Sequence, residues 1–163
     1  MTTAILMETP IGALWIEGDD DAITEIRLPL PDGQPASAAT SSGTEAAPAA
    51  VSKLVTQLEE YFVGERTEFD VPLALAGTPF QKDVWMALAE IPYGKSVSYA
   101  ELAGMVGRPT AFRAVGQANG ANPIPIVLPC HRVLASGGKI GGYGGGLAMK
   151  RKLLELEGLT GIA

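Results

Sequence analysis

The sequence predicts an α+β protein of two domains, and three observations favour this class. Residues 1–77 alternate short apolar segments with turns and include one amphipathic segment of helical period, as expected of a small sheet with one helix. Residues 78–163 instead consist mostly of segments with helical caps, separated by glycine and proline. At 163 residues the chain is long enough for one domain or two small ones.

In the N-terminal domain we expect a three-stranded antiparallel sheet and one helix. Apolar residues at 3–8 and 12–17 flank a Thr-Pro-Ile turn and predict a β-hairpin, and a third strand should follow an acidic turn over 22–28. Residues 29–48 are rich in Pro, Ser, Ala, Gly and Thr, which predicts a mobile loop. Apolar side chains then recur at helical spacing from about residue 49 to 63. No residue of this domain suggests catalysis.

In the C-terminal domain we expect mostly helices. Thr78 is placed to cap a helix that starts with proline, and Ser98 with Glu101 forms a capping box for the next one. The helices are expected over 79–90, 99–106, 111–120 and 147–156. An apolar extended run is expected over 124–128, and the basic run 150–152 should be exposed on the last helix.

The second and third of these helices are joined by a turn containing Gly107, which is the pattern of a helix-turn-helix. By itself this pattern is weak, because many helical hairpins bind nothing. The helix over 111–120 is rich in small side chains and carries Arg113, which suits insertion of a cation into a groove or base stack. Close packing in a core and a surface ion pair explain the same residues equally simply.

Five glycines surround Tyr143 in the segment 141–146. Such a loop offers backbone N–H groups to a ligand at close range. A cradle for a nucleotide phosphate is an alternative, but the glycine spacing matches neither of the usual phosphate-binding motifs.

The only cysteine and the only histidine of the chain are adjacent, in Pro129-Cys130-His131-Arg132-Val133. Cysteine attacks as the thiolate, and a nearby imidazole commonly lowers the thiol pKa toward neutrality. A buried apolar cysteine beside an incidental histidine is an equally good reading of the pair alone.

Composition and charge exclude several classes of protein. No apolar run approaches the ~20 residues of a membrane span, and no signal peptide is visible at the N-terminus. One cysteine cannot form an internal disulfide, which suits a reducing cytoplasm, and it cannot build a Cys/His zinc site. Residues 1–78 carry 13 acidic and 3 basic side chains, whereas residues 79–163 carry 5 acidic and 9 basic ones. The basic second part permits contact with phosphates, although a chance asymmetry gives the same numbers.

Several motifs follow one another in order along the last 85 residues or so. They are Ser98-Tyr99-Ala100-Glu101-Leu102-Ala103, Arg113-Ala114-Val115-Gly116, Asn122-Pro123-Ile124-Pro125-Ile126-Val127-Leu128-Pro129-Cys130-His131-Arg132-Val133, Gly142-Tyr143-Gly144-Gly145-Gly146-Leu147 and Leu153-Leu154-Glu155-Leu156-Glu157-Gly158. In residues, order and spacing this part resembles the O6-alkylguanine-DNA alkyltransferases of bacterial type, also called methylated-DNA–protein-cysteine methyltransferases. The first half resembles the N-terminal domain of that family only loosely.

The resemblance implies direct repair of alkylated DNA. Members of the family flip the damaged guanine out of duplex DNA, transfer its alkyl group irreversibly to cysteine, and are consumed. It implies a ribonuclease H-like N-terminal domain, O6-alkylguanine in double-stranded DNA as substrate, O4-alkylthymine as a second one, and no cofactor or metal. It also implies a cytoplasmic protein that is monomeric in solution and has no membrane partner; cooperative binding along DNA stays open.

For the chemistry, the resemblance implies four residues. Cys130 would accept the alkyl group, His131 would take the thiol proton through a water, and Glu157 would orient that network. Asn122 would form the hinge between the recognition helix and the active-site segment. A soft sulfur nucleophile suits displacement at a saturated carbon, and a hydrogen bond to the leaving base lowers the barrier.

For binding, the resemblance implies further residues. Arg113 would fill the gap left by the flipped base, and Tyr99 would help to rotate the phosphate. Tyr143 and the Gly144 backbone would donate toward O6, while the Val133 carbonyl would meet the exocyclic amine. Further substrate positions are Pro125 and Ser136, and further DNA positions are Ala100, Arg108, Thr110, Ala111, Ala114, Asn119 and Gly120.

One departure from the family pattern is Phe112, which stands beside Arg113 where the family usually has alanine. It either packs inward or alters how the recognition helix seats on DNA. Two other functions remain as alternatives, a non-catalytic protein that binds DNA lesions and an unrelated Cys-His hydrolase. A hydrolase would turn over many times, and a lesion binder would not need the thiol of Cys130.

Overall fold

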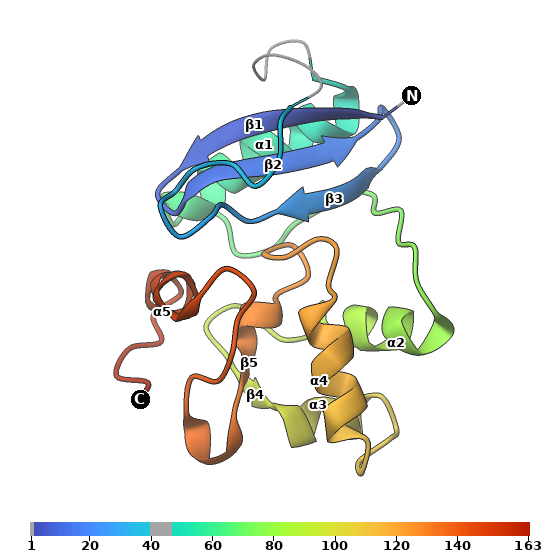
Figure 1. Ribbon diagram of the computed structural model, residues 1–163, viewed down its shortest axis with the longest axis vertical. Coiled ribbons are helices and arrows are strands. Elements are labelled where there is room, and N and C mark those ends of the chain that lie inside the picture. The colour runs from blue at the N-terminus through green and yellow to red at the C-terminus, as the bar shows by residue number, and fades with distance from the viewer. Residues whose placement is uncertain (1, 40–46) are drawn as a thin grey trace. The chain divides into compact units, whose positions relative to one another are not determined.

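The computed structural model describes residues 2–39 and 47–163. It divides into two units, Met1–Leu75 and Ala76–Ala163 (Figure 1). The first unit holds a three-stranded sheet and one helix, and the second is mostly helical, so the predicted α+β class is confirmed. The sequence had placed the boundary between residues 77 and 78.

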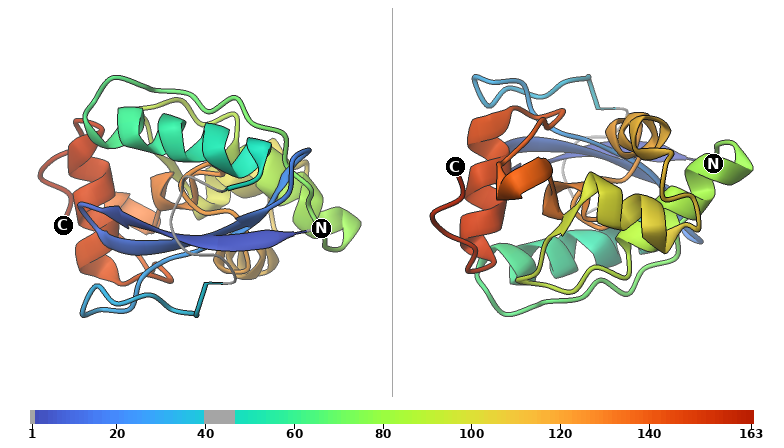
Figure 2. Two further views of the ribbon diagram at one scale, coloured as in Figure 1. Left: turned by 90° about the horizontal axis from the view of Figure 1, so that it is seen from above. Right: turned by 90° about the horizontal axis from the view of Figure 1, so that it is seen from below.

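The first unit is an antiparallel sheet in the order β1-β2-β3 with a helix on one face. Strands β1 (Thr3–Thr9) and β2 (Gly12–Gly18) form the predicted hairpin, in which Thr9 pairs with Gly12. Strand β3 (Ile23–Arg27) adds to β2. Helix α1 (Ala49–Phe62) contacts β1 and β2 and buries its apolar face against them (Figure 2). Pairing within the sheet and burial under α1 therefore account for the core of this unit.

Part of the predicted mobile loop 29–48, residues 40–46, lies outside the described residues. The part over 29–39 is attached to β2, because the Trp15 indole Nε1 donates to the Ala38 carbonyl at 3.0 Å. In this unit the sequence prediction of strands and helix is right to within one residue or so at each end.

The second unit places its helices around a two-stranded parallel sheet. This sheet pairs β4 (Val97–Ser98) with β5 (Val133–Leu134). The helices are α2 (Pro79–Leu88), α3 (Tyr99–Met105), α4 (Phe112–Gly120) and α5 (Leu147–Leu156), with short 3-10 turns η1 (Cys130–Arg132) and η2 (Ser136–Gly138). Both predicted N-caps form: Thr78 and Ser98 each take part in a complete capping box, with Gln81 and Glu101.

Two details of the second unit differ from the sequence prediction. Helix α2 ends at Leu88 rather than near residue 90. The segment 124–128 is a tight turn instead of an extended run, since Leu128 N donates to the Ile124 carbonyl at 3.0 Å and Ile126 has a φ of 75°. A positive φ on a β-branched residue is strained, and the turn is held by burial of its apolar side chains. The apolar run over 124–128, for which the sequence predicts an extended segment, therefore forms a buried turn.

Candidate active site

The last residues of α5 bring Glu157 to the segment that holds the adjacent cysteine and histidine. Glu157 is the C-cap of α5, and Gly158 follows it with a φ of 88°. Leu159 N donates to the Leu154 carbonyl at 2.9 Å and Gly158 N donates to the Glu155 carbonyl at 3.0 Å, which is the Schellman pattern. This fixed helix end sets the position of the Glu157 side chain.

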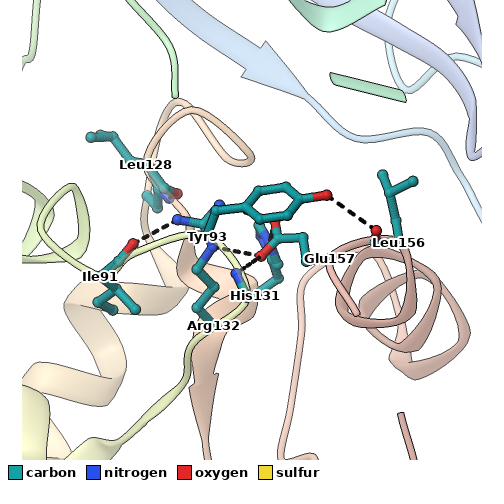
Figure 3. A network of polar contacts seen from close by, with 9 residues as sticks. Ile91, Tyr93, Leu128, His131, Arg132, Leu156 and Glu157 are labelled. Atoms are coloured by element: carbon teal, nitrogen blue, oxygen red, sulfur yellow. Dashed lines mark hydrogen bonds and ion pairs between the residues drawn. The ribbon is translucent and has the colours of Figure 1, made fainter. Parts of the chain in front are cut away.

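The Glu157 carboxylate is buried and is shared by two neighbouring side chains (Figure 3). His131 Nε2 lies 2.7 Å from Glu157 Oε2. Arg132 donates from Nε to Oε1 at 2.7 Å and from Nη2 to Oε2 at 3.0 Å. The sequence placed His131 and Glu157 in one network, and in the structure they are in direct contact.

Arg132 also ties this network to the chain that follows α2. Its Nη1 donates to the Ile91 carbonyl at 2.6 Å, and its guanidinium lies 5.8 Å from the centre of the Tyr93 ring (Figure 3). Tyr93 in turn donates to the Leu156 carbonyl at 3.2 Å. The sequence predicts no role for Arg132 or Tyr93, because no local pattern indicates a contact across more than 20 residues.

His131 is buried and neutral. Burial lowers the pKa of its imidazole, and the hydrogen bond to Glu157 offsets this only in part. A carboxylate can only accept, so Nε2 carries the proton and Nδ1 presents a lone pair. Nδ1 has no hydrogen-bond partner among the described residues. His131 is therefore set up to take a proton at Nδ1, with Glu157 compensating the charge that forms.

The Cys130 thiol is buried, with 7% of the residue exposed. Burial raises its pKa to about 11, and hydrogen bonds from Asn122 and Tyr143 lower it only partly. The expectation that the adjacent imidazole lowers this pKa is therefore wrong for the resting protein, because the ring is neutral and points to Glu157. The thiol rests protonated and needs a base during reaction.

Lys150 corrects a second expectation, since it is wholly buried rather than exposed on α5. Its ammonium donates to the Val133 carbonyl at 2.7 Å, to the Gly142 carbonyl at 3.1 Å and to the Ile140 carbonyl. Burial lowers the pKa of Lys150 to about 8. It ties the glycine-rich loop to β5, and its spacing of three and four residues from the buried Leu153 and Leu154 was the overlooked signal.

Asn122 connects the end of α4 to the active-site turn. Its Nδ2 donates to the Leu128 carbonyl at 2.7 Å, and its Oδ1 accepts from Ile124 N at 2.9 Å. It closes the turn over 124–128 from both sides and also bonds the thiol of Cys130. The residue expected to be a hinge thus holds the helix, the turn and the thiol together.

Residues of β4, α3, α4, β5 and η2 line a pocket of about 740 Å³. Among its lining residues are Tyr99, Ala100, Arg113 and Ser136, which the sequence assigned to substrate or DNA. Burial raises the pKa of Tyr99, and a hydrogen bond from the Asn119 side chain partly offsets this. The structure therefore brings these residues to one hollow.

The positions predicted to bind substrate or DNA differ in how far they are exposed. Exposed ones suited to contact with a large ligand are Ala100, Arg108, Thr110, Arg113, Ala114, Gly120, Ser136 and Gly144. Ala111, the N-cap of α4, and Tyr143 are half-buried. Val133 and Pro125 are buried, and Pro125 is not among the residues that line the pocket. Asn119 is also buried, so in this structure it supports Tyr99 and does not face solvent.

Over 2–39 and 47–163, no group of three or more His, Cys, Asp or Glu side chains could hold a metal ion. Within the same part of the chain, no helix is both long and apolar enough to cross a membrane.

A pair of short helices, a buried thiol and an imidazole–carboxylate pair are the features expected of a DNA-binding transferase with a cysteine acceptor. The family model described as 6-O-methylguanine DNA methyltransferase, DNA binding domain, matches residues 79–159, and that of the ribonuclease-like domain matches residues 3–75. The chain belongs to the methylated-DNA–protein-cysteine methyltransferase family, which acts in DNA repair.

Relatives support this over nearly the whole chain. The methylated-DNA–protein-cysteine methyltransferase of Mycobacterium tuberculosis is 49% identical over 93% of this chain and 89% of its own length. The constitutive one of Bacillus subtilis is 43% identical over 94% and 93%. The crystal structure of M. tuberculosis O6-methylguanine methyltransferase matches with a TM-score of 0.81 at 45% identity, over 100% of this chain and 96% of that one. A structure of M. tuberculosis OGT in complex with DNA gives 0.81 at 46% identity, over 98% and 95%.

Proposed function

We propose that this protein removes the alkyl group from O6-alkylguanine in duplex DNA, and from O4-alkylthymine, by transferring it irreversibly to Sγ of Cys130. The observation that carries the assignment is the buried pair of Cys130 and His131, with the proton of the imidazole fixed on Nε2 by Glu157. Each molecule acts once, because the thioether that forms has no acceptor to release the group to.

The chemistry balances with these groups alone. The thiol proton passes through a water to Nδ1 of His131, and the resulting thiolate forms a bond from Sγ to the alkyl carbon. The bond from that carbon to O6 breaks, and its electron pair stays on the guanine. The guanine takes up one proton from the imidazolium through water, so that His131 returns to its neutral state. Glu157, held by Arg132, stabilises the imidazolium. No cofactor is required.

The resting pKa of about 11 for Cys130 fits such a single use. A protonated thiol reacts slowly with unrelated electrophiles, so the one acceptor of the molecule is preserved. Deprotonation then becomes part of the reaction, once the substrate has displaced bulk water and placed its carbon near Sγ.

Burial of Cys130 also supports base flipping. A stacked base cannot present its alkyl group to a buried thiol, so the nucleotide must leave the duplex. Arg113 is exposed on α4 and would occupy the vacated position, while Tyr99 in the pocket would meet the rotated nucleotide. Tyr143 and the Gly144 backbone would donate to O6, and the Val133 carbonyl would accept from the amine.

The proposal also covers the setting of the reaction. The protein would act in the cytoplasm, as a monomer in solution, on double-stranded DNA and without a membrane partner. The exposed positions of α3, of α4 and of the turn between them, including Arg108, would face the DNA backbone. Cooperative binding along DNA is open.

Mass spectrometry tests the proposal. The protein is incubated with an equimolar duplex that carries one O6-methylguanine and is then digested with trypsin. The peptide from residue 114 to 132 should gain the mass of one methyl group, and Cys130→Ala should gain none. An unmodified peptide at full stoichiometry would contradict the proposal, and so would turnover of excess substrate, which a hydrolase would show. Methyl, ethyl and benzyl adducts then give the range of alkyl groups.

A further inference from the structure

Phe112 is a large apolar side chain that the fold does not use. It is the first residue of α4, and 51% of it is exposed. It is the only aromatic residue among the large apolar side chains that are exposed in the part of the chain described. The residues next to it in the chain, Ala111, Arg113 and Ala114, are small or basic. An aromatic ring kept in water at such a place gains free energy when a partner covers it.

The ring lies at the wall of the pocket that holds the predicted substrate residues. Phe112, Arg113 and Gly116 of α4 all line this pocket, together with Tyr99. Gly116 is one helical turn beyond Phe112, and a Cβ placed on it would lie 3.7 Å from the Tyr99 ring. Phe112 therefore lies on the side of α4 that is turned toward Tyr99 of α3, while Arg113 projects about 100° further round α4.

The surroundings favour nucleic acid as the partner. Small residues next to Phe112, such as Ala111 and Ala114, allow the start of α4 to come close to a ligand. Arg113 follows Phe112 directly and is exposed. Arg108, which precedes α4, is also exposed, and its guanidinium lies 5.3 Å from the centre of the Phe80 ring; both cations complement a polyanion. The carboxylate of Glu101 also lines the pocket, but it accepts a hydrogen bond from Ser98 N at 2.9 Å in the capping box. An exposed apolar ring next to a cation suits stacking on a base beside a phosphate backbone.

We propose that Phe112 is a second DNA-contacting residue of α4, whose ring stacks on the nucleobase that borders the flipped nucleotide. This inference rests on the proposed function, because it requires that the nucleotide leave the duplex. Arg113 fills the vacated position, and Phe112 covers the neighbouring base that loses its stacking partner. A contact of this kind exists only in the flipped state, so it favours that state over the intact duplex.

The experiment compares wild-type protein with Phe112→Ala and Phe112→Trp in two reactions. The first is single-turnover transfer from duplex DNA with O6-methylguanine, and the second is transfer from free O6-benzylguanine. A 2-aminopurine next to the lesion reports the stacking of that base. Met86→Ala is the matched control, because Met86 is an equally exposed apolar residue, with 55% exposure, on α2 outside the pocket.

We expect Phe112→Ala to lower the rate constant for duplex DNA per unit of protein roughly 5- to 100-fold, the value of one aromatic stacking contact. Transfer from the free base should change less than twofold, and the 2-aminopurine signal should rise because its base is no longer covered. Phe112→Trp should retain the wild-type values. The substitution is at an exposed helix start, so it should not disturb folding.

Three results would overturn the inference: equal duplex rates for Phe112→Ala and wild type, equal losses on duplex and free base, or a faster reaction of the alanine variant. The last would mean that the ring obstructs the DNA. If Cys130 of the wild-type protein is alkylated by neither substrate, the proposed function is refuted instead. The two failures are therefore distinguishable in the same set of measurements.

Discussion

Replacement of Arg132 by methionine tests whether the buried ion pair holds the second unit together. The guanidinium makes two charged hydrogen bonds to Glu157, at 2.7 and 3.0 Å, and one to the Ile91 carbonyl at 2.6 Å. Methionine fills much of the same volume but leaves a buried carboxylate without its cation. Removing one partner of a buried pair costs about 3–5 kcal/mol. At about 4–8 °C per kcal/mol for a unit of the size of Ala76–Ala163, the Tm of that unit should fall by roughly 12–40 °C.

The assay should follow the second unit alone. The chain has two tryptophans, Trp15 in the first unit and Trp85 in the second. Trp85 is buried on α2 and its Nε1 donates to the Ala118 carbonyl at 2.8 Å, so its fluorescence reports packing of the helices. In a Trp15→Phe background, urea unfolding followed at Trp85 gives the free energy of unfolding of that unit.

A double-mutant cycle with Glu157→Gln isolates the pair. Each single variant strands one buried partner, whereas the double variant strands neither charge. We expect the double variant of Arg132 and Glu157 to lose no more stability than the worse single one. A loss below about 1 kcal/mol for Arg132→Met, or fully additive losses in the cycle, would refute the reasoning. Arg132→Lys, which keeps the charge but cannot bond both carboxylate oxygens, should lie between wild type and methionine.

Three further predictions follow from the same unit. Because burial raises the pKa of Cys130 from 9.0 to about 11, the stability that the protonated thiol contributes is complete below about pH 9 and is lost between about pH 9 and 11. The lowered pKa of Lys150 changes the stability in the opposite direction over an overlapping pH range. The contribution of Cys130 should therefore be measured by urea unfolding as the difference between wild type and Cys130→Ala. Lys150→Met should leave three backbone carbonyls without their donor and lower the free energy of unfolding by at least about 2 kcal/mol, with faster hydrogen exchange in the glycine-rich loop; unchanged exchange would contradict the assigned contacts. Gly77→Ala should lower the free energy of unfolding by about 1–3 kcal/mol, measured by thermal unfolding, because its Cβ would lie 2.6 Å from the Trp85 ring. Gly116→Ala is the control and should be nearly neutral, because its Cβ would have its nearest atom at 3.7 Å. Equal effects of the two substitutions would exclude this explanation.

Local patterns in the sequence predicted the elements well where one kind of signal decides them. The capping residues Thr78 and Ser98 define helix starts through bonds that span three residues, so the sequence contains the whole interaction. The hairpin of β1 and β2 is likewise set by alternation and a short turn. The turn at 124–128 was missed because an apolar run reads alike as a strand or as a buried turn.

The site was predictable in its residue types but not in its electrostatics. His131 and Glu157 were placed together by resemblance, and the structure puts them in contact. The partners of Arg132 and Lys150 are carbonyls and a carboxylate that are distant in sequence; the helical spacing of Lys150 indicates its burial but not these partners. The direction of the Cys130 pKa could not be read either, because it follows from burial rather than from the neighbouring residue.

Helix α5 and its C-cap set the spacing between two contacts to the candidate active site. Lys150 and Glu157 are seven residues apart, close to two full turns, so they lie on one face about 10 Å apart along the axis. From that face the Lys150 ammonium contacts the Val133 carbonyl and the Glu157 carboxylate contacts His131. One rigid helix therefore holds two points of the reactive segment at a set distance from each other. Adding or deleting one residue between them would rotate one charge by about 100° away from its target. The length of this helix in residues is thus constrained by its two contacts with the reactive segment, independently of which residues cover its outer side.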